Sequence, residues 1–247
     1  MQNSFERFGI THLSASALNL WRGAPGIYAL RYIAGMKDSG NPAMWRGSAV
    51  ENGLVALLRG QPLASALNAA YQSFDLNSKD YQDIDGDMSA ERELIAPMIE
   101  QCAKWKAPSM LNASQLRIEY YFDPVPIPVI GYLDLGFDGI DIDLKSTKAC
   151  PSAPRSDHVR QVSIYRAARN RNGGVLYVTN KRHAYFDISD DMMNEALDEL
   201  RADALSLNNF LAKCDNREEV LRSLPIDYSH FQAPKVRVPL SEILMGG

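Results

Sequence analysis

The chain has 247 residues, of which 46% are hydrophobic, and a net charge of −4. This size and apolar content can bury a full core, and the absence of any run of 18 apolar residues excludes a transmembrane helix. Since no signal peptide is found either, we expect a soluble, cytoplasmic protein with no membrane partner. Three scattered cysteines indicate reduced thiols and exclude a disulfide framework or a zinc site: Cys102, Cys150 and Cys214.

The charge is unevenly distributed. Residues 144–186 carry nine Lys or Arg and one acid, Asp157, so this segment is +8 and the remainder is −12. A local basic face on an acidic body is typical of phosphate binding, and a solvated basic face without a ligand is the alternative.

Helical periodicity predominates in the first 112 residues. A first helix begins near Ser14 or Ser16, either of which can cap it. The further helices that we expect cover residues 27–35, 43–59, 62–74 and 89–106. Pro97 predicts a kink or break in the last of them. Residues 75–87 are predicted as an exposed acidic loop, because the sequence after Asp83 lacks the glutamate of an EF-hand.

Strand patterns begin after residue 113. Residues 114–122 alternate with period two and predict the first strand of a sheet, and residues 129–137 and 140–144 predict a hairpin around Asp138-Gly139. Asp134, Asp143 and Lys145 then lie in neighbouring strands. Two carboxylates beside a lysine can hold a divalent cation and place a cationic donor near a phosphoryl oxyanion.

The rest of the chain continues an α/β pattern. A basic helix over residues 155–172 places Gln161 and Tyr165 on one face, because they are four residues apart. Two strands, two helices and an irregular tail follow, over residues 175–179, 182–188, 188–211, 216–223 and 225–247. This order predicts an α/β sandwich with a mixed central sheet of about five strands.

Four short motifs resemble the core of the PD-(D/E)XK nucleases, in particular their RecB-like and phage exonuclease branch. They are Gly47-x-Ala49-x-Glu51, Gly131-x-x-Asp134, Asp143-x-Lys145 and Gln161-x-x-x-Tyr165. The resemblance implies a restriction-endonuclease-like core, with a mixed β-sheet flanked by helices, and an N-terminal helical lobe. It implies one nuclease domain over residues 1–247, made of a helical part (1–112), a catalytic core (113–190) and a C-terminal helix and tail (191–247).

The resemblance also implies roles for these residues. The implied ligands of one or two Mg²⁺ or Mn²⁺ ions are Glu51, Asp134, Asp143 and the backbone carbonyl of Leu144. Considered without the other motifs, Glu51 would be interpreted as a surface glutamate of a helix. The presence of the other motifs favours its assignment as a metal ligand. Lys145 would orient or deprotonate the attacking water, while Gln161 and Tyr165 would position water and phosphate. The iron–sulfur cluster of some relatives is excluded, because the cysteines lack its number and spacing.

Hydroxyl and basic side chains near these motifs are the expected DNA contacts: Ser14, Ser16, Ser146, Thr147, Lys148, Arg155, Arg160 and Arg166. Helix capping explains the first two serines equally well. A lone histidine on the basic helix, His158, is more often a structural hydrogen-bonding group, and a contact with DNA is the alternative.

The implied function is metal-dependent hydrolysis of DNA phosphodiester bonds from DNA ends, in recombination, repair or phage DNA processing. The expected partner is DNA. The sequence leaves open three further partners, namely a second copy of the chain in a homo-oligomer, a single-strand annealing protein and a helicase. Any unwinding would come from a separate helicase, because the chain has no nucleotide-binding loop of its own. A phage origin would place the protein in the host cytoplasm. The alternatives are a non-catalytic DNA-binding module with the same fold, a structure-specific endonuclease, and a metal-dependent hydrolase of small molecules, against which the basic segment argues.

Overall fold

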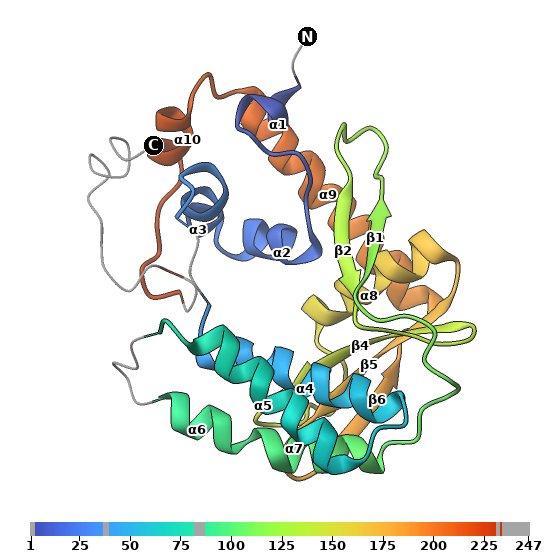
Figure 1. Cartoon of the computed structure of the whole chain (residues 1–247). Coiled ribbons are helices and arrows are strands. Elements are labelled where there is room, and N and C mark those ends of the chain that lie inside the picture. The colour runs from blue at the N-terminus through green and yellow to red at the C-terminus, as the bar shows by residue number, and fades with distance from the viewer. Residues whose placement is uncertain (1–2, 37–39, 82–86, 231–232, 234–247) are drawn as a thin grey trace. The chain divides into compact units, whose positions relative to one another are not determined.

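The computed structural model describes residues 3–36, 40–81, 87–230 and 233 (Figure 1). The chain forms two compact units. The first comprises Met1–Ser39, Ile118–Gly131 and Asn194–Gly247, and the second comprises Gly40–Arg117 and Tyr132–Met193. The acidic loop expected over residues 75–87 is shorter than predicted, because α5 continues to Ser78, and its residues 82–86 lie outside the described residues. Nearly all of the tail beyond residue 230 also lies outside them. None of the described helices has the length and apolar character needed to cross a membrane.

The helices of the described chain are α1 (Ser4–Arg7), α2 (Ala15–Gly23), α3 (Pro25–Tyr28), the π-helix η1 (Ala29–Ile33), α4 (Pro42–Leu58), α5 (Leu63–Ser78), α6 (Asp87–Glu93), α7 (Ile95–Lys104), α8 (Ser156–Arg169), α9 (Asp190–Ala212) and α10 (Arg217–Ser223). The strands are β1 (Leu116–Tyr120), β2 (Val129–Leu133), β3 (Leu135–Gly136), β4 (Ile140–Ser146), β5 (Asn172–Val178) and β6 (His183–Asp187).

The second unit contains a mixed four-stranded sheet in the order β3-β4-β5-β6. Strands β4 and β5 are parallel, with Asp143 opposite Val175, while β3 pairs with β4 and β5 with β6 in antiparallel fashion. Helix α8 forms the crossover that joins the two parallel strands. The predicted mixed sheet flanked by helices is confirmed. The placing of β1 in that sheet was wrong, because β1 pairs with β2 in a separate two-stranded sheet.

The strand expected over residues 129–137 is interrupted at Asp134. Strand β2 ends at Leu133 and β3 begins at Leu135. The Asp134 carboxylate accepts a hydrogen bond from the backbone N–H of Leu144, with Oδ2 at 2.8 Å. The side chain therefore bonds to the backbone of β4 at the point where the regular strand is broken.

Helices α4, α5 and α7 pack together in the second unit (Figure 1). Helix α4 begins with Asn41, whose side chain accepts a hydrogen bond from the N–H of Met44 at 3.0 Å. A Cβ added at Gly53 would lie 2.3 Å from Cδ1 of Ile99, so a larger residue would force the Ile99 side chain of α7 to move.

Two element boundaries differ from the prediction for identifiable reasons. The helix expected over residues 89–106 breaks at Leu94, and Pro97 lies in the first turn of α7, where its missing N–H leaves no hydrogen bond unmade. Helix α8 ends at Asn170, which is left-handed (φ 50°), so β5 already begins at Asn172. Gly174 lies inside β5, at a position where a Cβ would approach the Tyr185 hydroxyl to 2.3 Å.

The first unit is mainly helical. Ser14 caps α2 by accepting a hydrogen bond from the N–H of Ala17 at 3.1 Å. Trp21 packs on Tyr28 and Phe210, with ring centroids 5.6 and 5.4 Å apart. The capping role expected for Ser14 is confirmed.

Candidate active site

Strand β4 presents Asp143 and Lys145 at the centre of the candidate site. Asp143 is completely buried, and neither of its carboxylate oxygens accepts a well-aligned hydrogen bond from the described residues. Its Oδ2 lies 2.8 Å from Nζ of Lys145, which is close enough for an ion pair. A buried carboxylate with oxygens to spare is able to accept a further cation.

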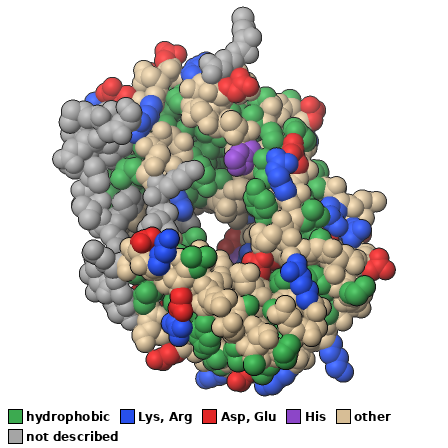
Figure 2. All heavy atoms as spheres, viewed as in Figure 1, with side chains coloured by type: hydrophobic (Ala, Val, Ile, Leu, Met, Phe, Trp, Pro, Cys, Tyr) green, Lys and Arg blue, Asp and Glu red, His purple; other side chains and the backbone are tan. Residues whose placement is uncertain are grey.

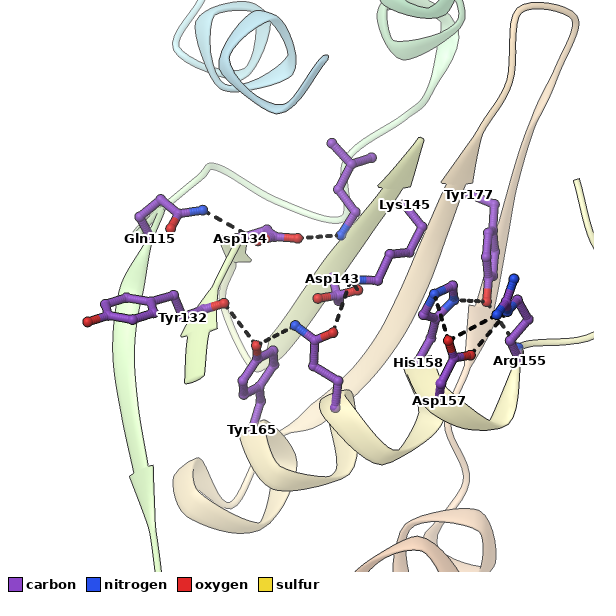
Figure 3. Close-up of polar contacts among 12 residues, drawn as sticks. Gln115, Tyr132, Asp134, Asp143, Lys145, Arg155, Asp157, His158, Tyr165 and Tyr177 are labelled. Atoms are coloured by element: carbon purple, nitrogen blue, oxygen red, sulfur yellow. Dashed lines mark hydrogen bonds and ion pairs between the residues drawn. The ribbon is translucent and has the colours of Figure 1, made fainter. Parts of the chain in front are cut away.

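A chain of hydrogen bonds fixes Lys145 from the side of α8 (Figure 3). The Lys145 ammonium donates to Oε1 of Gln161 at 3.0 Å, and Nε2 of Gln161 donates to the Tyr165 hydroxyl at 2.7 Å. That hydroxyl donates to the carbonyl of Tyr132 at 2.9 Å. Both ends of the Gln161 amide are therefore engaged, and Tyr165, which is 2% exposed, holds it in place.

A second chain of contacts joins the other two acids of the motifs. Glu51 on α4 and Asp134 both accept hydrogen bonds from the amide nitrogen of Gln115, and the Asp134 contact measures 3.4 Å. The N–H of Leu144 completes this chain at Asp134 Oδ2. The structure thus brings together Glu51, Asp134 and residues 143–145, and it adds Gln115, which the sequence analysis missed.

The charges in this cluster act on one another. Burial raises the pKa of Asp134 well above its ordinary value, and the charges of Asp143 and Glu51 raise it further. Burial also raises the pKa of Glu51. Burial lowers the pKa of Lys145, but Asp143 and Asp134 outweigh it, so the net shift is upward. The lysine therefore remains a cation at neutral pH.

The residues fit a hard divalent cation in their chemistry. Carboxylate oxygens are the ligands that Mg²⁺ and Mn²⁺ prefer, and the two oxygens of Asp143 lack hydrogen bonds. Within the described ranges, no three His, Cys, Asp or Glu side chains are grouped closely enough to hold a metal ion as they stand. The implied ligands are neighbours that would have to move their side chains to surround an ion.

A buried ion-pair network supports the end of β4. Arg46 on α4 is paired with Glu91 on α6, and both are about 5% exposed. Arg46 also donates to the backbone carbonyl of Ser146 at 3.1 Å, and Lys148 Nζ lies 2.6 Å from the Glu91 carboxylate. This network connects the helix that carries Glu51 to the strand that carries Lys145. A Cβ added at Gly47 would meet Ser146 Oγ at 3.7 Å, which is an ordinary contact.

Two expected DNA contacts need correction. Arg166 is 6% exposed, and its guanidinium donates to the carbonyl of Ile188 at 2.6 Å and to Asp190 at 2.7 Å. Arg160 is 3% exposed. The sequence placed both on the DNA face, because hydrophobic periodicity does not reveal that an arginine such as Arg166 will turn inward to a buried carbonyl.

The remaining expected contacts vary in their surroundings. The Thr147 hydroxyl donates to the carbonyl of Ala149 at 2.9 Å. Lys148 and Arg155 have side chains 68% and 62% exposed, each beside an acid. Ser14 and Ser16 belong to the first compact unit, where their hydroxyls are 3.0 Å apart. On the face that Figure 2 shows, basic and acidic side chains are interspersed without a continuous basic stripe.

His158 lies beside this site in a polar cluster at the start of α8 (Figure 3). Its Nδ1 is 2.6 Å from the Tyr177 hydroxyl, and the same hydroxyl accepts the N–H of Arg155 at 3.0 Å. Burial lowers the pKa of His158 to about 4, and the charge of Lys145 acts in the same direction. The expectation of a hydrogen-bonding histidine is confirmed.

Comparison with known proteins identifies the family and supports the fold. A family model described as the PD-(D/E)XK nuclease superfamily matches residues 12–236. The crystal structure of a protein from Eubacterium rectale, described as a "putative exonuclease", has 14% sequence identity and a TM-score of 0.55, covering 96% of this chain and 94% of that one. A second structure, of SSO0001, has 13% identity and a TM-score of only 0.32, covering 76% and 89% of the two chains. None of the curated proteins compared with the chain matches it.

Proposed function

The chain belongs to the PD-(D/E)XK nuclease superfamily, and we propose that it is a metal-dependent exonuclease that hydrolyses DNA phosphodiester bonds from DNA ends. The observation that carries the proposal is the placement of Lys145 Nζ between the buried Asp143 carboxylate, at 2.8 Å, and the Gln161 amide, at 3.0 Å. These two contacts fix the orientation of the Lys145 ammonium group.

The residues of the cluster take distinct parts in this proposal. Glu51, Asp134, Asp143 and the carbonyl of Leu144 would hold one or two Mg²⁺ or Mn²⁺ ions. A bound ion would lower the pKa of a water molecule and offset negative charge on the scissile phosphate. Lys145 would donate to the phosphoryl oxygen as its charge grows.

Gln161 and Tyr165 act through Lys145. Their hydrogen bonds run from the lysine to the backbone of Tyr132, and the Tyr165 hydroxyl is already occupied. We therefore assign them as positioning residues, in place of the direct contact with phosphate that the motif suggested. Preorganisation of this kind avoids reorienting the lysine during the reaction.

Action on DNA ends is supported by the resemblance to phage-type and RecB-like exonucleases. The description of the Eubacterium rectale protein is consistent with it. A role in recombination, repair or phage DNA processing follows from the same resemblance, and we propose that both compact units serve one nuclease domain. Lys148 and Arg155 remain as the basic side chains proposed to contact neighbouring phosphates.

The proposal is tested with end-labelled linear duplex, linear single-stranded and closed circular DNA, incubated with Mg²⁺, Mn²⁺ or EDTA. The proteins compared are wild type and Lys145→Ala. The matched control is Lys181→Ala, on the exposed turn after β5. We expect metal-dependent loss of linear DNA only, abolished by Lys145→Ala and retained by Lys181→Ala. Cutting of circles would show an endonuclease. Salt-sensitive binding without cleavage of any substrate would show a non-catalytic DNA-binding module.

A further inference from the structure

We propose that Gln115 is a positioning residue that holds Glu51 and Asp134 together as a pair of ligands for the divalent cation. This inference rests on the proposed function and adds to it a residue outside the four motifs. Gln115 precedes β1, and no spacing in the sequence connects it to the acids.

The side chain of Gln115 bridges two acids that come from separate elements. Its Nε2 donates to Oε1 of Glu51, on α4, and to Oδ1 of Asp134, at 3.4 Å, in the break between β2 and β3. Because one amide nitrogen contacts both carboxylates, the two negative charges lie close together and repel each other. A shared donor offsets part of that repulsion.

The backbone at and just before Gln115 is held by contacts with two other elements. Gln115 has φ +52°, a left-handed conformation that is uncommon for residues other than glycine. Ala113 exchanges backbone hydrogen bonds with Gly136 of β3, at 3.1 and 2.8 Å, and Ser114 Oγ accepts from Arg59 at the end of α4, at 3.3 Å. The residues just before Gln115 are thus anchored to the elements that carry both acids. Strained backbone of this kind persists where the surrounding structure enforces it, and it clusters at active sites.

An amide is the side chain best suited to this position. It donates hydrogen bonds without a charge, so it holds the acids while leaving their negative charge available to a cation. Each carboxylate has about four lone-pair sites, of which the amide uses one. A lysine here would compete with the cation, and a carboxylate would add repulsion.

The test measures the affinity of the full chain for Mn²⁺ by isothermal titration calorimetry, without DNA. Gln115→Leu keeps most of the side-chain volume and removes the hydrogen bonds, and Gln72→Leu on the exposed face of α5 is the matched control. We expect Gln115→Leu to weaken Mn²⁺ binding about tenfold, in line with the effect of residues that orient metal ligands, while the control binds like wild type. Equal affinity of Gln115→Leu and wild type would overturn the inference.

A second variant separates ligand positioning from a purely structural role. Gln115→Glu places a third acid beside Glu51 and Asp134, so we expect a lower melting temperature than wild type in EDTA and a larger rise on adding Mn²⁺. If Mn²⁺ shifts the melting temperatures of wild type, Gln115→Leu and Gln115→Glu equally, Gln115 is only structural. If wild type itself does not bind Mn²⁺, the proposed function fails, and the inference fails with it.

Discussion

Two aspartates on β4, Asp141 and Asp143, show how one residue type serves two purposes. Both are completely buried and lie two positions apart. Asp141 is paired with Arg169, whose Nε lies 2.7 Å away, and this pair ties the strand to α8. Asp143 faces Lys145 and keeps both oxygens without hydrogen bonds. The partner of each acid, and not its burial, distinguishes a structural aspartate from a candidate ligand.

His158 gives a prediction for stability against pH. Its pKa in the folded protein is about 4, below the ordinary value of 6.5, because burial and Lys145 disfavour the charged ring, while Asp157 opposes them. The unfolded chain therefore binds a proton between these values when the folded chain does not. Stability should fall as pH decreases from about 6.5 to about 4.

The measurement compares the free energy of unfolding in urea at pH 7 and pH 4.5 for wild type and His158→Gln. The variant should lose about 2 kcal/mol less than wild type over this interval. Contributions from other acids are common to both proteins and cancel in the comparison. Equal losses would show that His158 titrates normally in the folded protein.

Local spacing explains which site residues could be predicted from the sequence. Asp143 and Lys145 share a strand face, and Gln161 and Tyr165 share a helix face, so short motifs describe them. Gln115 could not be found in this way, since its place depends on a left-handed backbone and on anchoring to β3 and α4. The inward turn of Arg166 likewise depends on the carbonyl of Ile188, which is distant in sequence.

At the scale of elements, the Arg46–Glu91 pair connects α4, α6 and the end of β4. Arg46→Met leaves the buried Glu91 carboxylate with only the exposed Lys148 as a partner, so the variant should cost about 3 kcal/mol of stability. The double variant Arg46→Met/Glu91→Leu should recover most of this loss, because no unpaired charge remains. Urea unfolding of the two single variants and the double variant measures the coupling. Strictly additive losses would contradict a direct interaction.

Element boundaries were predictable where the local signals agree with the packing. Helix α4 begins one residue before the predicted start, at Pro42 after the Asn41 cap, and ends one residue early. The predictions failed where packing overrides a local signal. The helix predicted over residues 155–172 ends at Arg169, and Gly173 and Gly174 lie in β5, where added Cβ atoms would clash with Arg166 and Tyr185.

At the scale of the whole molecule, the net charge of −4 and the basic segment over residues 144–186 have to be considered together. Much of that segment's charge is paired with acids within the second unit, including Asp141, Asp143 and Glu91. DNA binding should therefore depend on a few exposed cations. Arg155, paired with Asp157 at 3.1 Å on the surface, is one of them.

The salt dependence of binding tests this view. We expect the dissociation constant for a short duplex to rise steeply between 50 and 200 mM salt, and Arg155→Gln to reduce the slope of log K against log salt by about 1. Arg222→Gln is the matched control, since Arg222 is also an exposed arginine beside an acid, Glu218. Its slope should equal that of wild type. A slope unaffected by Arg155→Gln would remove this residue from the DNA contacts.

The most direct test of the central claim, hydrolysis at the Asp143–Lys145 pair, compares two buried aspartates of the same strand. The initial rate of loss of end-labelled linear duplex is measured with Mn²⁺ for wild type, Asp143→Asn and Asp141→Asn, at a temperature where all three are folded by circular dichroism. We predict that Asp143→Asn reduces the rate about 10³-fold, while Asp141→Asn, which weakens only the pair with Arg169, stays within about threefold of wild type. Equal rates for Asp143→Asn and wild type would contradict the account.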